Sequence, residues 1–258
     1  PAALNTGADA VYLGLSEFSA RKNAENFSVE ELKTACTECH KRGVKVYAAL
    51  NTLVYDSEAE KFAECVKSAA ECGVDGLIIQ DPAVMRLFRD RYPALPRHAS
   101  TQMTLNSAAG VNAAQQLGFC RAVIGRELSF EQIKRIAENT GIELEVFVHG
   151  ALCVCISGQC YMSSIFGGRS GSRGLCAQPC RLPYTLEDGT SGYLLSTKDL
   201  MLIDRIPELR DAGVYSFKLE GRMKRPEYVG VITRAYREAL DAAEAHVSYH
   251  PSQAVIEG

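Results

Sequence analysis

The sequence predicts an α/β protein of the (β/α)8 TIM-barrel type. Short buried-strand runs alternate with helix-period runs along most of the chain, which indicates a parallel sheet. Seven such units are visible, and with one more strand expected before residue 1, eight units in about 250 residues fit a barrel better than an open sheet. The early strands are also not followed by the G-x-G-x-x-G turn typical of a Rossmann sheet. An open doubly wound sheet is the alternative.

The expected strands are the short apolar runs, and the helices between them have recognisable start signals. Ser28-Val-Glu-Glu31 and Ser129-Phe-Glu-Gln132 are capping boxes, and Pro82 follows an Asp that can cap. Strands are expected at 10–14, 45–51, 76–80, 97–101, 121–125, 144–150 and 216–221. Helices are expected before Gly7, from Ser28, and over 57–72, 82–91, 107–117, 130 onward, 200–212 and 226–245.

The chain is expected to divide into four parts. Residues 1–150 hold barrel units, 151–192 a cysteine-rich insertion, 193–245 the barrel-closing unit and 246–258 a polar tail. One more strand before residue 1 would complete the eight, and the chain begins inside a helical pattern without an initiator Met, as a fragment does. The insertion then follows the seventh strand, and its Glu187-Asp-Gly-Thr between apolar runs predicts a hairpin.

Composition excludes several classes of protein. With 28 basic and 31 acidic residues the net charge is −3, which does not indicate a strongly basic nucleic-acid binder. No apolar run approaches the ~20 residues that span a bilayer, so no membrane partner is expected. No secretory signal opens the chain, and half of its ten cysteines fall in one segment. We therefore expect a reducing, cytoplasmic location rather than a disulfide-stapled secreted domain. The oligomeric state is not predicted.

Polar side chains gather where the predicted strands end, which in a barrel is the position of the active site. Strand interiors are almost wholly apolar by contrast, so we expect a polar mouth over an apolar barrel. His149 is a candidate general acid or base, although a histidine bonded to backbone is equally compatible. The candidate catalytic residues are His149, Glu220 and Gln102, and the candidate substrate-binding residues are Arg126, Arg222, Asn51, Gln80 and Lys218.

Four cysteines of the insertion are candidate metal ligands. Cys153, Cys160, Cys176 and Cys180 are separated by six, fifteen and three residues, with glycines between them that permit sharp turns. Thiolates suit zinc or an iron–sulfur cluster. Structural zinc usually shows two short Cys pairs, so this spacing favours the cluster. Two disulfides, or unliganded thiols, are the alternatives.

Several runs resemble the U32 family of collagenase-like peptidases. The most specific is Glu145-Val-Phe-Val-His-Gly-Ala-Leu-Cys153-Val-Cys-Ile-Ser-Gly-Gln-Cys160, continued by Gly-Gly-Arg169-Ser-Gly-Ser-Arg-Gly-Leu-Cys176-Ala-Gln-Pro-Cys180-Arg. Asp9-Ala-Val-Tyr-Leu-Gly14, Ser100-Thr-Gln-Met and Phe217-Lys-Leu-Glu-Gly-Arg-Met-Lys also match, so the resemblance covers about residues 8–240.

The resemblance implies a barrel-like domain and one of two activities. The family is named for proteolysis, including collagen degradation. Other members are iron–sulfur proteins of oxygen-independent hydroxylation, acting on a ribosomal RNA cytidine, a transfer RNA uridine or ubiquinone precursors, with prephenate linked to the hydroxyl source. This chain is most similar to the ribosomal RNA type.

Carried over to this sequence, the resemblance makes Cys153, Cys160, Cys176 and Cys180 the ligands of a four-iron cluster, and a small carboxylate co-substrate would suit Arg126 and Arg222. RNA docking is expected to need a C-terminal region that this chain lacks. A metal-dependent peptidase and a non-enzymatic domain with structural zinc remain the alternatives.

Overall fold

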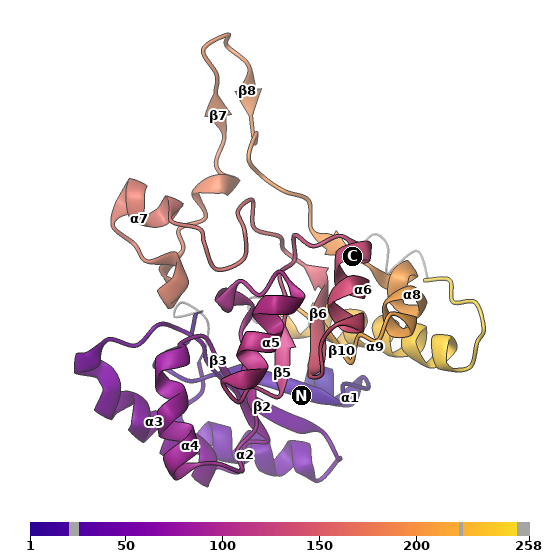
Figure 1. Ribbon diagram of the computed structural model, residues 1–258. Helices are drawn as coiled ribbons and strands as arrows, with labels where there is room; N and C mark the ends of the chain where they lie inside the picture. The colour runs from indigo at the N-terminus through magenta and orange to yellow at the C-terminus, as the bar shows by residue number, and fades with distance from the viewer. Residues whose placement is uncertain (21–25, 222–223, 252–258) are drawn as a thin grey trace.

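A curled sheet of parallel strands forms the centre of the computed structural model, which describes residues 1–20, 26–221 and 224–251 (Figure 1). Seven strands run in the order β1-β2-β3-β4-β5-β6-β10, and all their pairings are parallel. Each of the seven strands predicted within the chain is present, and most of their carboxyl ends come one or two residues earlier than predicted. The bounds are β1 Ala10–Gly14, β2 Lys45–Leu50, β3 Gly76–Ile79, β4 Arg97–Ala99, β5 Arg121–Val123, β6 Glu143–Gly150 and β10 Ser216–Leu219.

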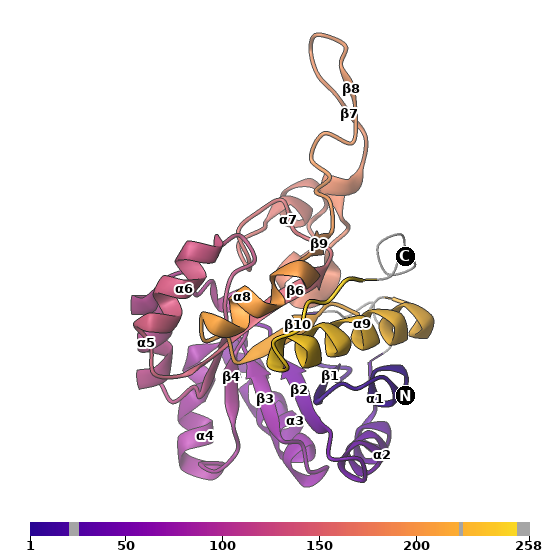
Figure 2. The same ribbon diagram turned by 90° about the vertical axis from the view of Figure 1, so that its right-hand side faces the viewer.

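Helices surround the outer face of the sheet (Figure 2). Both predicted capping boxes form: the Ser28 hydroxyl accepts from the Glu31 N–H, and the Glu31 carboxylate accepts from the Ser28 N–H at 2.8 Å. The helices are α1 Ala2–Asn5, α2 Val29–His40, α3 Ala59–Glu71, α4 Met85–Arg91, α5 Ala108–Gln116, α6 Phe130–Glu138, α8 Ile206–Asp211 and α9 Pro226–Glu244. In the described part of the chain, none of them is long and apolar enough to cross a membrane.

The hydrophobic core lies between the sheet and the helices. Strand residues alternate in direction, so one set from each strand meets the helices and the other faces the interior of the curl. Val46, Leu50, Leu77 and Ile79 belong to the main core, together with Leu32 of α2 and residues of the other helices. Tyr47, Ala49 and Ile78 form a small separate cluster, at the strand positions that face the interior of the curl.

The sheet does not close into the predicted barrel of eight strands. Within the described residues, β1 and β10 are the edge strands, and each pairs on one side only. A cavity of about 1200 Å³ lies between them, lined by β1, β10, α1, α2 and α9. The Tyr12 hydroxyl donates to the Leu219 carbonyl across this opening, at 3.2 Å. The fold is therefore a half-barrel, open at the position where an eighth strand would lie.

The cysteine-bearing segment leaves the sheet after β6. It contains the short helix α7 (Met162–Gly167), two tight turns (Gly171–Leu175 and Pro179–Arg181), and a hairpin of β7 (Tyr184–Thr185) and β8 (Ser191–Gly192). The predicted hairpin is thus present, although its second strand lies at 191–192. In Figure 1 it projects away from the body of the molecule.

The helix predicted from residue 200 begins later. Leu200–Met201 forms β9, which pairs antiparallel with His149 and Gly150 at the end of β6. The Leu202 N–H then donates to the Val148 carbonyl at 2.9 Å. These backbone bonds to β6 replace the helical ones, and α8 starts only at Ile206, where Pro207 occupies its first turn.

Candidate functional site

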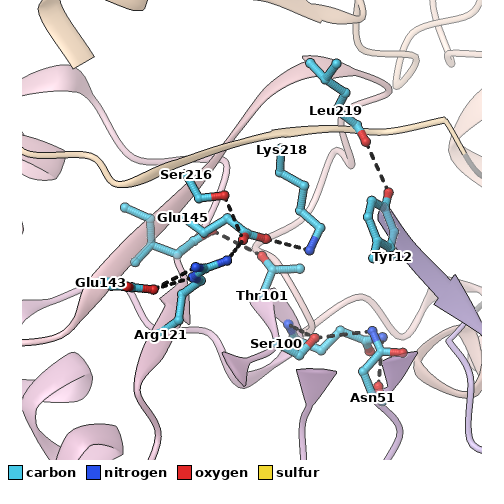
Figure 3. A network of polar contacts seen from close by, with 12 residues as sticks. Tyr12, Asn51, Ser100, Thr101, Arg121, Glu143, Glu145, Ser216, Lys218 and Leu219 are labelled. Carbon is cyan, nitrogen blue, oxygen red and sulfur yellow. Dashed lines mark hydrogen bonds and ion pairs between the residues drawn. The ribbon is translucent and has the colours of Figure 1, made fainter. Parts of the chain in front are cut away.

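Three predicted residues meet at the carboxyl ends of β2, β3 and β4. Asn51 Nδ2 donates to Ser100 Oγ at 3.3 Å, as Figure 3 shows. Gln102 Nε2 donates to the Asn51 carbonyl at 3.3 Å, and Gln80 Nε2 donates to the Gln102 carbonyl at 3.4 Å. Gln80 Oε1 is buried and has no hydrogen-bond partner among the described residues. The cluster is neutral, and this acceptor is able to receive an N–H or O–H group from a ligand.

Arg126 connects the end of β5 to the start of the cysteine-bearing segment. One guanidinium nitrogen donates to the Ala151 carbonyl at 2.8 Å, and another lies 3.9 Å from Cys153 Sγ. The guanidinium also lies over the Phe147 ring, 4.8 Å from its centroid. A pocket of about 80 Å³ is lined by Arg126, Leu152, Cys153 and their neighbours. Arg126 therefore places a positive charge beside a candidate ligand.

Ser157 anchors the same segment to the sheet. Its hydroxyl donates to the Glu127 carboxylate at 2.8 Å, and its carbonyl accepts from the Thr104 hydroxyl at 2.8 Å. Burial acts to raise the pKa of Glu127, but hydrogen bonds from Asn106 and Ser157 outweigh burial and hold that pKa below its usual value. Our sequence analysis did not select Ser157. Its position, just beyond a cysteine pair and before a glycine, is the one signal that points to it.

The four predicted ligands lie between the end of β6 and the hairpin, in one stretch of the cysteine-bearing segment. Burial raises the pKa of the Cys180 thiol, the charge of Arg181 opposes this rise, and Cys176, Cys153 and Cys160 add to it. Cys176 Sγ accepts from the Gln178 N–H at 3.4 Å and lies 3.8 Å from Ser163 Oγ. All ten cysteines are free, so the predicted alternative of two disulfides is not what the structure has.

This donor set fits a thiolate-bound metal in its chemistry. Four thiols share one region, and an N–H group and a hydroxyl point at one of the sulfurs, as in sites that hold thiolates. Their spacing is not yet that of a ligand shell: within the described ranges, no three His, Cys, Asp or Glu side chains stand close enough to hold an ion.

His149 and Glu220 lie side by side at the ends of β6 and β10. The Glu220 N–H donates to the His149 carbonyl at 3.1 Å. The His149 ring packs against α9, 5.9 Å from the Tyr228 ring and 5.5 Å from the Tyr236 ring. Burial lowers the pKa of His149. Arg222, the other predicted cation here, lies outside the described residues.

The interior of the curl is charged, which corrects the expectation of an apolar barrel. Figure 3 shows Lys218 and Arg121 on either side of the Glu145 carboxylate, at 2.6 and 3.3 Å. Arg121 also pairs with Glu143 at 2.7 Å, and Ser216 donates to Glu145 at 3.0 Å. Lys218, predicted to bind substrate, is therefore held by a buried partner rather than at the mouth. Of these residues the sequence analysis selected only Lys218; Arg121, Glu143 and Glu145 were not selected because they lie inside or at the start of predicted strands rather than at their carboxyl ends.

Together, the sheet and its cysteine-bearing segment define a parallel α/β half-barrel with polar strand ends beneath a group of thiols. Comparison with known proteins identifies the family: the profile of peptidase family U32 matches residues 1–255, and the chain belongs to this family.

Three curated relatives differ in their names. The 23S rRNA 5-hydroxycytidine C2501 synthase of Escherichia coli is 42% identical over 92% of this chain and 36% of its own length. The tRNA hydroxylation protein P1 of Bacillus subtilis is 34% identical over 93% of this chain and 60% of its own. The Collagenase of Porphyromonas gingivalis is 34% identical over 93% and 62%. The chain thus spans between about a third and two thirds of these relatives.

Among solved structures, a protein described as the U32 peptidase Mk0906 aligns with 57% of this chain and 64% of its own. The TM-score is 0.49 and the sequence identity is 18%.

Proposed function

We propose that this chain is the barrel part of an iron–sulfur enzyme that hydroxylates an RNA base without oxygen, closest to the ribosomal RNA cytidine type. One observation carries the proposal: Cys153, Cys160, Cys176 and Cys180 lie in one segment that starts at the carboxyl end of β6, with Arg126 3.9 Å from Cys153 Sγ. The names of the two RNA-hydroxylation relatives supply the substrate class.

The proposed ligands are Cys153, Cys160, Cys176 and Cys180. When bound, a four-iron cluster supplies an electron-transfer or Lewis-acidic centre beside the strand ends. Cys155 is not among the ligands, since its thiol lies 3.5 Å from the Gln159 carbonyl within its own turn. Zinc is the alternative occupant of the same four thiols.

The chain's own residues have separate proposed roles at this site. Arg126 would bind the carboxylate of a prephenate-linked co-substrate, because its Nε is buried without a partner in the described part of the chain. The amides of Asn51, Gln80 and Gln102 would bind the polar edge of a base. Glu220 and His149 would exchange protons with the substrate.

RNA docking is proposed to involve more protein than this chain. Phosphate contacts dominate the affinity of nucleic-acid complexes, and a chain of net charge −3 supplies few of them. The relatives are longer than the matched region, so their remaining parts are the proposed source of these contacts. The proposed place of action is the cytoplasm, since both reduced thiols and RNA are found there.

Nucleoside mass spectrometry of cellular RNA tests the proposed reaction. Cells that lack the protein are complemented with its wild-type form, with Cys176→Ser or with Cys155→Ser. We expect wild type and Cys155→Ser to restore one hydroxylated nucleoside, and Cys176→Ser to leave it missing.

The relative named Collagenase keeps a peptidase as the second candidate. Unchanged RNA in all three strains, together with collagen cleavage by the purified protein that is lost in His149→Ala, would replace the hydroxylase proposal with the peptidase. The same unchanged RNA with no cleavage would favour a domain whose metal is structural.

A further inference from the structure

The hydroxyl group of Tyr236 is the hydrogen-bonding partner of His149. Tyr236 Oη lies 3.3 Å from His149 Nδ1 and 2.7 Å from the Val148 carbonyl oxygen. It also accepts from the Leu202 N–H at 3.1 Å, and this N–H is shared with the Val148 carbonyl oxygen at 2.9 Å. Tyr236 is buried, and its ring meets that of His149 edge-on, so this contact is part of the packing of α9 against β6.

Counting protons in this group decides which atom of each pair donates. The tyrosine hydroxyl has one proton, and a carbonyl oxygen can only accept. At 2.7 Å, two oxygens without a proton between them would repel each other, so the tyrosine proton lies on the bond to Val148. Burial raises the pKa of Tyr236, which keeps that proton in place. His149 Nδ1 therefore faces lone pairs of Oη and must itself donate.

We propose that Tyr236 fixes His149 in the tautomer that carries its proton on Nδ1, so that Nε2 is the acceptor of the ring. Burial lowers the pKa of His149 despite the opposing carboxylate of Asp199, so the ring holds one proton near neutral pH. Tyr236 is then a positioning residue for His149, much as a buried partner orients the imidazole in other enzymes.

The tautomer determines what His149 can bind. An unprotonated Nε2 accepts from a hydroxyl or an amine and repels a carboxylate or phosphate oxygen. If the bound group gives up its proton, its X–H bond breaks with the electron pair left on X, and an N–H bond forms at Nε2. The other charged and titratable groups that face this ring are Asp199, Glu220, Lys224 and Tyr228.

The choice of ligand rests on the proposed function, whereas the tautomer does not. An RNA nucleotide offers both kinds of donor, as the exocyclic amine of cytidine and the ribose 2′-hydroxyl. His149 is thereby assigned to a hydroxyl or amine of the substrate, and the carboxylate of a co-substrate is left to Arg126.

Nitrogen NMR of protein with 15N-labelled histidine tests the tautomer directly. His149→Gln identifies the signals of His149 by their loss. At pH 8 we expect long-range proton–nitrogen correlations to show a protonated Nδ1 and an unprotonated Nε2 in the wild-type protein. Tyr236→Phe should abolish this preference, giving Nε2–H or a mixture, while the matched control Tyr228→Phe should keep it.

A protonated Nε2 in the wild-type protein would overturn the proposal, and so would an unchanged pattern in Tyr236→Phe. If Tyr236→Phe does not fold, the wild-type spectrum decides alone. Iron content is measured on the same sample. An iron-free protein with Nδ1–H would contradict the proposed function while leaving this inference intact. An iron-loaded protein with Nε2–H would overturn this inference while leaving the proposed function intact.

Discussion

Glu145 shares its carboxylate between two cations inside the sheet. Burial acts to raise its pKa, but Lys218, with Arg121, outweighs burial and holds the pKa below the usual value. We predict that Lys218→Met destabilises the protein by about 3–5 kcal/mol, because it removes one partner of a buried ion pair. Urea unfolding measures this. The control Lys41→Met, whose partner Glu38 is exposed, should change little. An equal, small effect of both variants would contradict the prediction.

His98 makes stability depend on pH. Burial, and then the charge of Arg121, lowers its pKa from 6.5 to about 3. Below pH 6.5 the unfolded chain binds a proton at His98, whereas the folded chain does not bind one until the pH approaches about 3. The free energy of unfolding therefore decreases as the pH falls through this range. We predict that this group removes about 1.4 kcal/mol per pH unit between about pH 5.5 and 4.5, and about half as much per unit near pH 6.5. Urea titrations of His98→Gln should show a slope smaller by that amount. An unchanged slope would contradict it.

For single residues, the sequence predicted the location of polar side chains at strand ends better than that of charged side chains within strands. Asn51, Gln80 and Gln102 meet because parallel strands end at one edge, which the alternation of elements already implies. The partnership of Arg121 with Glu145 could not be read from the chain, because it depends on the register of β5 against β6.

Among the elements, the cysteine-bearing segment approaches the sheet closely at Gly158, next to the Ser157 contacts. Gly158 has a positive φ of 79°, and a Cβ there would lie 2.4 Å from the Gln102 carbonyl oxygen. We predict that Gly158→Ala displaces the segment, reduces bound iron and exposes residues 151–199 to proteolysis. Gly168→Ala is the matched control, since Gly168 also has a positive φ but no atom within 4 Å. Equal iron content in the two variants would refute this role.

The elements themselves were largely predictable, for local reasons. Ser28 and Ser129 cap helices through contacts three residues apart, which a sequence displays directly. The two residues of β9, Leu200 and Met201, are too few to show a hydrophobic periodicity, so the sequence assigned them to the following helix. Only their pairing with His149 and Gly150 makes them a strand.

For the whole molecule, the open edge of the sheet is the feature with a measurable consequence. β1 and β10 pair on one side only and border a cavity of about 1200 Å³, whereas β2 to β6 are paired on both sides. We predict that amides of β1 and β10 exchange hydrogen faster than those of β3 and β4. Hydrogen exchange followed by mass spectrometry measures this. Equal protection would mean that the opening is closed in solution.

The central claim is that Cys153, Cys160, Cys176 and Cys180 hold an iron–sulfur cluster. The most direct measurement is iron, acid-labile sulfide and zinc per chain in protein purified without oxygen. We expect about four iron and four sulfide in the wild-type protein. Cys155→Ser should retain them, and Cys176→Ser should lose them. One zinc without iron, or iron that survives in Cys176→Ser, would contradict the account.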